Sequence, residues 1–238
     1  MAANQVAQAV REQLGIGRVL PLGGPADGAW ITEQAAARAL RDAVGAPSAA
    51  RIGRLRLSVA DPGHAPRPVV PPPPSALPPG PLRITADIEV ALAAPARDRP
   101  LPAVADEVRA ALLAASVREL GLVVGAVDLL VSGVPEATEE AVAQPARAPA
   151  GGRTGAGPEG TEGLAAVALG VPGVARLAPV LGGRARPVRL AEGHALIQVA
   201  VAAGHRALNV SGAVRRAVAA APNPPSTVTV LVTAVERT

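Results

Sequence analysis

The 238-residue sequence contains no cysteine, no lysine, no phenylalanine and no tyrosine. The lack of cysteine excludes disulfides, thiolate metal sites and cysteine nucleophiles, and it is compatible with a reducing compartment. Trp30 is the single large aromatic residue, so a core has to be built from Ala, Val, Leu and Ile. Each fully buried Val or Leu contributes roughly 1.5–3 kcal/mol, and we therefore expect modest stability.

The charge is mild and carried by one kind of cation. All 23 basic residues are arginine and 19 residues are acidic, which leaves a net charge of +4. The pI of about 11.2 is high mainly because Lys, Tyr and Cys are missing. The densest basic patch holds Arg184, Arg186 and Arg189, and no aromatic residue is interleaved there to stack on a base. Nucleic acid is therefore a disfavoured partner.

The sequence shows no sign of a membrane span. No apolar run reaches the ~18–20 residues that cross a bilayer. The N-terminal stretch lacks the basic start and apolar centre of a secretory signal. We predict a cytoplasmic protein that is peripheral at the membrane, if at all, through a partner.

The clearest pattern lies between Leu82 and Val134. Residues 82–92 alternate apolar and polar, 102–120 form an amphipathic helix that Gly121 ends, and a second apolar strand follows. A strand–helix–strand connection within one sheet is right-handed, which predicts two parallel strands. The expected buried residues are Val104, Val108, Leu112 and Ala115 on the helix, and Val127, Leu129 and Val131 on the second strand.

A helix and a strand precede this unit. The helix is expected from the N-cap Thr32 to about Val44, with Ala36, Ala39, Leu40 and Val44 buried and Trp30 as a hydrophobic anchor at its start. The strand at 52–60 is expected to pair antiparallel with 82–92, with Arg54 opposite Asp87 and Arg56 opposite Thr85.

Residues 61–81 hold a run of four prolines at 71–74. The favoured interpretation is a stiff, solvated hairpin loop. The alternative is a polyproline II segment that docks in an aromatic groove of a partner.

The order of elements predicts an α+β fold of two small two-layer modules, each with a three-stranded mixed sheet and two helices on one face. Residues 135–163 lack periodic apolar residues and are interpreted as a flexible linker. Beyond the linker the helix–strand–strand–helix–strand order recurs, which favours a tandem repeat. The predicted divisions are an N-terminal segment 1–29 with a helix at 3–14 and a Gly/Pro-rich connector at 15–30, a first module 30–134, the linker 135–163, and a second module 164–238.

No residue cluster specifies a reaction. His64, His194 and His205 lack metal-site spacing and are interpreted as surface histidines. Asp106 and Glu107 favour the positive end of a helix rather than an acid–base pair. Ser211 lies near a helix start without the full GxSxG motif. We therefore predict no catalytic, cofactor or metal residues. An enzyme using Ser211, His194 or Asp106 is the least favoured alternative.

Residues 102–134 resemble the end of the alkaline shock protein family of Gram-positive bacteria. The resemblance rests on an amphipathic helix, a turn at Leu120-Gly121-Leu122 and a valine-rich strand that closes on Gly133-Val134. The family's Val-Pro-Gly-Val follows the first helix of the second repeat, at 171–174. The resemblance is to a tandem actinobacterial member, and it implies a cytoplasmic, non-catalytic protein that reaches the membrane through partners and supports envelope homeostasis.

Together these observations predict an interaction or scaffold protein with a protein partner, which could be membrane-anchored, and with a homo-oligomer left open. The alternative is a nucleic-acid-binding protein that uses the Arg-rich surfaces of its small α+β modules.

Overall fold

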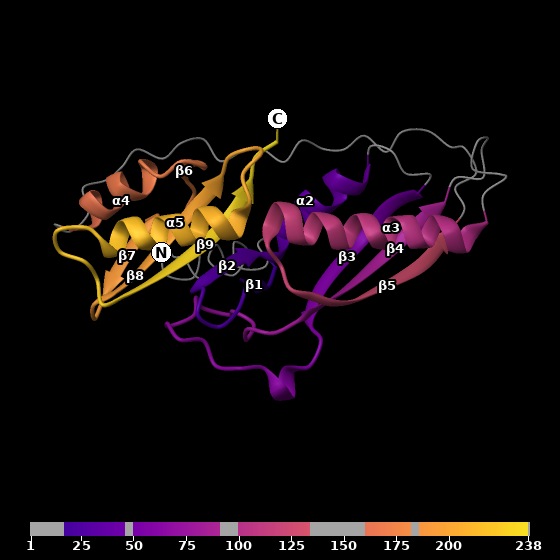
Figure 1. Ribbon diagram of the computed structural model, residues 1–238, viewed down its shortest axis with the longest axis horizontal. Coiled ribbons are helices and arrows are strands. Elements are labelled where there is room, and N and C mark those ends of the chain that lie inside the picture. The colour runs from indigo at the N-terminus through magenta and orange to yellow at the C-terminus, as the bar shows by residue number, and fades with distance from the viewer. Residues whose placement is uncertain (1–16, 46–49, 91–99, 134–159, 182–185, 238) are drawn as a thin grey trace, which may run out of the picture.

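The computed structural model describes residues 17–45, 50–90, 100–133, 160–181 and 186–237. This part of the chain is an α+β protein with two mixed sheets, and helices α3 (Leu101–Ala115) and α5 (Ala207–Ala219) lie end to end across one side of them (Figure 1). The predicted helix at 3–14 and most of the predicted linker lie outside the described residues. Among the helices that are described, none has the length and apolarity to cross a membrane.

The smaller sheet has the strand order β3-β4-β5. Strand β3 (Ala50–Val59) pairs antiparallel with β4 (Leu82–Val90), which pairs parallel with β5 (Val124–Gly133). The crossover runs through α3 (Leu101–Ala115) and a π-helical turn, η3 (Ser116–Leu120). The predicted strand–helix–strand unit with parallel strands is thus confirmed.

Helix α2 (Glu33–Gly45) packs beside α3 and against β3. Thr32 acts as its N-cap, as predicted, because the Thr32 hydroxyl accepts a hydrogen bond from the Ala35 amide at 3.3 Å. The residues expected to be buried on this helix are buried: Ala36, Ala39, Leu40 and Val44.

The predicted cross-strand charge pair between Arg54 and Asp87 does not form. A bulge in β3 places both Gly53 and Arg54 opposite Asp87, and no ion pair joins the two charges in the part of the chain described. A bulge adds one unpaired residue to a strand and redirects the side chains beside it. Beyond the bulge the register is as predicted, with Arg56 opposite Thr85.

Strand β5 is less buried than predicted. Val127 and Leu129 pack against the core, but Val131 is 48% exposed. The pairing with β4 shifts register near both ends of β5, beyond Val124 and beyond Val131. Because β5 is also the terminal strand of its sheet, only one of its two edges is covered by a neighbouring strand.

The larger sheet has the order β1-β2-β9-β8-β6, and β7 also pairs with β8. Strand β2 pairs parallel with β9, and β8 pairs parallel with β9 across helix α5. Helix α4 packs beside α5. The bounds of these elements are β1 (Val19–Leu22), β2 (Ala29–Thr32), α4 (Thr161–Leu169), β6 (Val174–Leu177), β7 (Val188–Ala191), β8 (His194–Val201), α5 (Ala207–Ala219) and β9 (Thr227–Val235).

The segment 15–30, predicted as a connector, contributes β1 and the start of β2 to this sheet. Arg215 of α5 holds the turn between the two strands, because its guanidinium donates to the carbonyls of Ala26, Asp27 and Val228. Gly28 permits this approach: it has a φ of 56°, and a Cβ there would lie 2.8 Å from the Arg215 guanidinium carbon.

One hydrophobic core runs beneath both sheets. It includes Ile84 and Leu112 from the smaller sheet and its helix, and Ile31 and Val230 from the larger sheet. The two halves come into close contact at Gly121, whose left-handed backbone ends η3 as predicted. A Cβ at Gly121 would lie 2.5 Å from the Leu208 Cβ of α5. The two halves are therefore packed as one body.

Residues 61–81 form a strap across the second face of the larger sheet, below β1 and β2 (Figure 1). We name this segment the proline strap; it contains a short 3₁₀ helix, η1 (Pro62–His64). Val70 packs with Trp30 of β2 and Leu231 of β9 in a separate buried cluster.

Hydrogen bonds fix the proline strap to the larger sheet. The Thr229 hydroxyl donates to the Pro71 carbonyl at 2.8 Å, and the Leu77 amide donates to the Val19 carbonyl at 2.8 Å. The prediction of a solvated loop is therefore wrong where the segment packs on the sheet, at Val70 above all, while Pro71, Pro72, Pro74 and Ser75 are exposed. The segment does join two antiparallel strands as a hairpin connection, as predicted, but its apolar residues cover Trp30.

Candidate functional site

The predicted surface histidines lie apart from one another. His64 contacts the Asp61 carboxylate at 2.8 Å in the exposed part of the proline strap. His194 begins β8, where its Nδ1 lies 2.8 Å from the Thr227 hydroxyl. Burial lowers the pKa of His194 below its ordinary value of 6.5, and the contact with Thr227 offsets part of that effect. The described residues contain no group of three or more side chains suited to hold a metal ion.

Two of the residues considered for an enzyme, Ser211 and Asp106, have partners within the fold. Ser211 is buried within α5, and its hydroxyl donates to the Ala207 carbonyl one turn earlier at 2.9 Å. Asp106 pairs with Arg109 at 2.5 Å on the exposed side of α3. Both side chains therefore have partners within the described fold.

The predicted basic patch is only partly described. Arg184 lies outside the described residues, whereas Arg186 and Arg189 are exposed beside and on β7. The Arg186 carbonyl accepts a hydrogen bond from the buried Gln198. Arg186 and Arg189 are therefore exposed surface residues, and neither lines the pocket described next.

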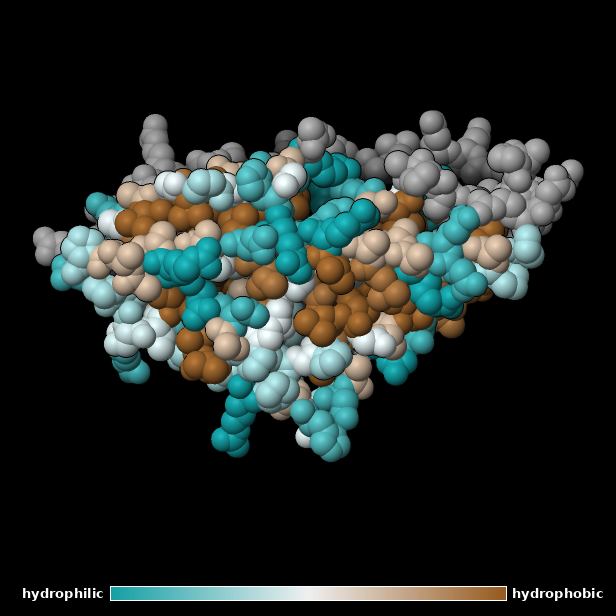
Figure 2. Space-filling view, viewed as in Figure 1, coloured by the Kyte–Doolittle hydropathy of each residue, from teal (hydrophilic) through white to brown (hydrophobic). Residues whose placement is uncertain are grey.

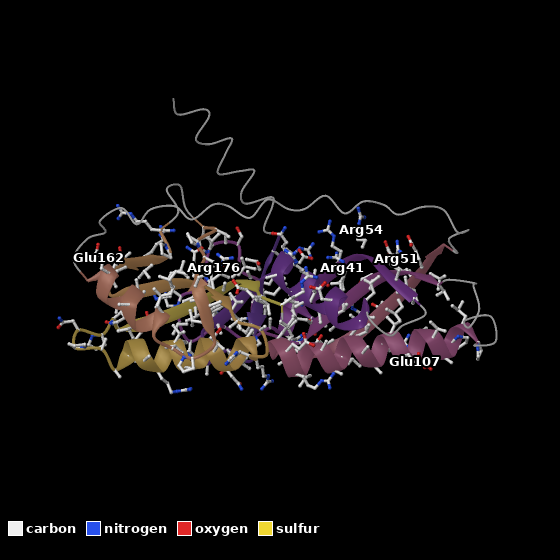
Figure 3. All side chains as sticks on the ribbon, turned by 90° about the horizontal axis from the view of Figure 1, so that it is seen from above. Arg41, Arg51, Arg54, Glu107, Glu162 and Arg176 are labelled. Atoms are coloured by element: carbon white, nitrogen blue, oxygen red, sulfur yellow. The ribbon has the colours of Figure 1, made fainter. Side chains whose placement is uncertain are left out.

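A different set of arginines does line a pocket, of about 270 Å³, between α2 and the outer edge of β3. Arg41 comes from α2, and Arg54 and Arg56 come from β3 on either side of Leu55. Figure 3 shows Arg41 and Arg54 on the side of the molecule away from α3 and its Glu107. We call this feature the arginine pocket. The remaining lining residues are Gly17, Glu33, Gln34 and Ala37.

Glu33 forms the buried inner wall of the arginine pocket. Its carboxylate accepts hydrogen bonds from the backbone amides of Arg18 at 3.2 Å and Leu57 at 3.1 Å. The Arg56 guanidinium lies 4.0 Å from the same carboxylate. Glu33 therefore joins the start of β1 to the outer edge of β3, and its charge is held mainly by backbone donors.

Exposed apolar side chains concentrate on α3, η3 and β5. Of the nine large hydrophobic residues that are exposed in the described chain, six lie between residues 101 and 131. Figure 2 shows apolar surface where α3 leads into β5. We define the α3–β5 surface by five of these residues: Leu113, Val117, Val123, Leu130 and Val131.

Comparisons with protein-family models, with curated proteins and with solved structures found no match to this chain. The resemblance of residues 102–134 to the alkaline shock family therefore stays a prediction.

Neither surface was predicted from the sequence. The arginine pocket depends on the bulge at Gly53 and on the approach of α2 to β3, which no local pattern encodes. The α3–β5 surface had a signal in Leu113 and Val117, which are apolar and one helical turn apart outside the predicted buried stripe.

Proposed function

We propose that this protein is a non-catalytic interaction or scaffold protein that binds a protein partner through the α3–β5 surface. The observation that carries the proposal is the concentration of exposed apolar residues there. Single exposed hydrophobic residues are ordinary on a protein surface, but several of them on neighbouring elements favour a site of interaction. Leu113 lies on α3, Val117 lies four residues later on η3, and Val123 follows the turn after η3.

The two outer edges of the smaller sheet support the same proposal. Exposed strand edges invite pairing with other chains, and proteins protect them with charges, bulges or covering groups. Strand β3 is protected in this way: it carries arginines and a bulge, and side chains from Arg18, Glu33 and Arg41 bond its outer backbone groups. Strand β5 instead presents Leu130 and Val131 at 54% and 48% exposure.

The pairing of the strands supports a tandem origin as part of the proposal. In the first half, β3 is antiparallel to β4, and β4 is parallel to β5 across a helix. In the second half, β7 is antiparallel to β8, and β8 is parallel to β9 across a helix. We propose that the second half repeats the first with β6 added. The repeated strand pairing and the alkaline shock resemblance together favour a partner at the cell envelope.

The test compares how two leucine substitutions, one in each half of the molecule, change the binding of a partner. Affinity purification from cells identifies partners, which are then purified and titrated against the wild type and the variants Leu130→Glu and Leu190→Glu. Leu190 is 44% exposed on β7 and serves as the control. We expect Leu130→Glu to weaken binding at least tenfold and to reduce recovery in the membrane fraction, with Leu190→Glu unchanged. Equal affinity of all three proteins for every purified partner would refute the proposal.

Light scattering of the purified protein tests the homo-oligomer alternative. If the partner is a second copy, the mass per particle falls toward that of a monomer in Leu130→Glu but not in Leu190→Glu. Circular dichroism shows whether both variants keep the fold, so that lost binding is not confused with unfolding.

A further inference from the structure

We propose that the arginine pocket is a binding site for a phosphate monoester group. The pocket lies on a different side of the molecule from the α3–β5 surface, and the inference does not rest on the proposed function. It follows from the charge of the lining residues, from their unused hydrogen-bond donors and from the backbone of β3.

The charge of the pocket suits a dianion. Arg41, Arg54 and Arg56 contribute three positive charges, and Glu33 contributes one negative charge, which leaves a net charge of +2 from these residues. A phosphate monoester carries about −1.5 to −2 at pH 7. Guanidinium groups match phosphate oxygens in geometry and donate paired hydrogen bonds to them.

The arginine donors are poorly used within the described part of the chain. There, Arg41 makes one hydrogen bond, from its Nε to the Gly53 carbonyl at 3.2 Å, and its terminal nitrogens bond no described residue. Arg56 lies 4.0 Å from Glu33, beyond hydrogen-bond distance. Arg54 makes no hydrogen bond or ion pair with any described residue. The surplus of donors over acceptors favours an external anion.

The bulge and the strand edge add to the site. The bulge directs the Gly53 carbonyl to Arg41 and so fixes this arginine beside Arg54. In an antiparallel pair, alternate residues direct both backbone groups away from the partner strand. Leu57 does so, since its amide and carbonyl bond Glu33 and Arg18. Leu55, two residues earlier, therefore presents its amide to the same edge, between two arginines of the pocket.

Glu33 does not block an anion, because its carboxylate already accepts two backbone hydrogen bonds. Its role is to hold the wall of the pocket and to orient Arg56. A ligand with one phosphate group would contact the three guanidinium groups and leave the remainder of the molecule toward solvent, since the pocket is open on one side.

The test uses phenyl phosphate as a probe. Its binding is measured by calorimetry and from the change in its ³¹P resonance. We expect saturable binding at one site, competition by inorganic phosphate, and weaker binding below pH 6, where the monoester loses its second charge. Arg54→Gln, which removes no contact within the described fold, should weaken binding at least tenfold. The control Arg189→Gln removes an exposed arginine on β7 and should leave the affinity unchanged.

Three results would overturn the proposal: no saturable binding of phenyl phosphate, equal weakening in both variants, or Arg54-dependent binding of an oligonucleotide without binding of the monoester. Cosedimentation with vesicles containing phosphatidic acid distinguishes the source of the phosphate. Retention that is lost in Arg54→Gln assigns a lipid headgroup, and binding of the soluble probe without retention assigns a soluble ligand.

Discussion

The substitution Ile84→Ala tests whether the two halves of the molecule unfold together. Ile84 is fully buried in β4 of the smaller sheet, whereas Trp30 lies in β2 of the larger sheet. Trp30 packs in the separate cluster with Val70, but its neighbours Ala29 and Ile31 share one core with Ile84. Loss of packing at Ile84 should therefore destabilise β2 and with it the environment of Trp30.

The magnitude follows from the burial of Ile84. Replacing a buried isoleucine with alanine costs about 2–5 kcal/mol in the free energy of unfolding. With a cost of about 3 kcal/mol and a urea dependence of about 2 kcal/mol per M, the midpoint should fall by about 1.5 M.

Trp30 makes the assay direct, because the sequence has no other tryptophan and no tyrosine. Its fluorescence reports on the larger sheet alone, while far-ultraviolet circular dichroism reports on all helices and strands. We expect both signals to show one transition and both midpoints to fall by the same amount. Leu190→Ala, at an exposed position of β7, is the control and should change the free energy of unfolding by less than about 0.5 kcal/mol.

The opposite outcome is equally clear. If circular dichroism resolves two transitions and the fluorescence midpoint of Ile84→Ala equals that of the wild type, the two halves are thermodynamically independent. The shared core would then contribute nothing to cooperativity, and the reasoning would be wrong.

Further predictions concern the larger sheet. Val70→Ala should increase acrylamide quenching of Trp30 fluorescence, because Val70 covers that side chain, and the exposed neighbour variant Val69→Ala should leave quenching unchanged. Gln198→Leu should lower the thermal midpoint, since the buried Gln198 amide bonds four backbone groups and each one left unpaired costs about 1–3 kcal/mol. His194 should make stability depend on pH: its folded pKa lies below 6.5, so its contribution is present above that pH and is lost as the pH falls below it. In chemical denaturation at several pH values, the free energy of unfolding of His194→Gln should depend less on pH than that of the wild type. An equal pH dependence in both proteins would contradict this prediction.

Local patterns predicted the elements whose residues contact near neighbours in the chain. The alternation in 82–90, the helical stripe of α3 and the Thr32 cap each reflect periodicity or capping chemistry, and each is confirmed. These features could be found because the physical cause lies within about one helical turn or one strand.

The hairpin of β1 and β2 could not be found in the same way. Its strands have four residues each and are buried on both faces, so they show no alternation. Pro21 also argued against a strand, since proline cannot donate to a sheet ladder. It is tolerated because β1 is the edge strand of the larger sheet. The partner of β2 is β9, almost the whole described chain away.

The candidate sites were missed for a related reason. The arginine pocket depends on the bulge that places Arg54 and Gly53 opposite one residue, and on the packing of Arg41 against β3. The sequence showed the arginines and their alternation but not the extra residue in the strand. The sequence predicted the proline strap as the hairpin connection between β3 and β4. Its contact with Trp30 could not be predicted, because that contact depends on the β1–β2 hairpin being part of the larger sheet.

The pairing of β2 with β9 has a consequence for synthesis of the chain. Trp30 lies opposite Leu231, so β2 leaves the ribosome long before its partner exists. At about 5–20 residues per second, the interval is about 10–40 s. During that time the four-residue β1 is the only strand partner of β2, and the edge of β2 that later pairs with β9 stays open. This edge is therefore exposed to aggregation and to chaperone binding until the last strand of the sheet has been made.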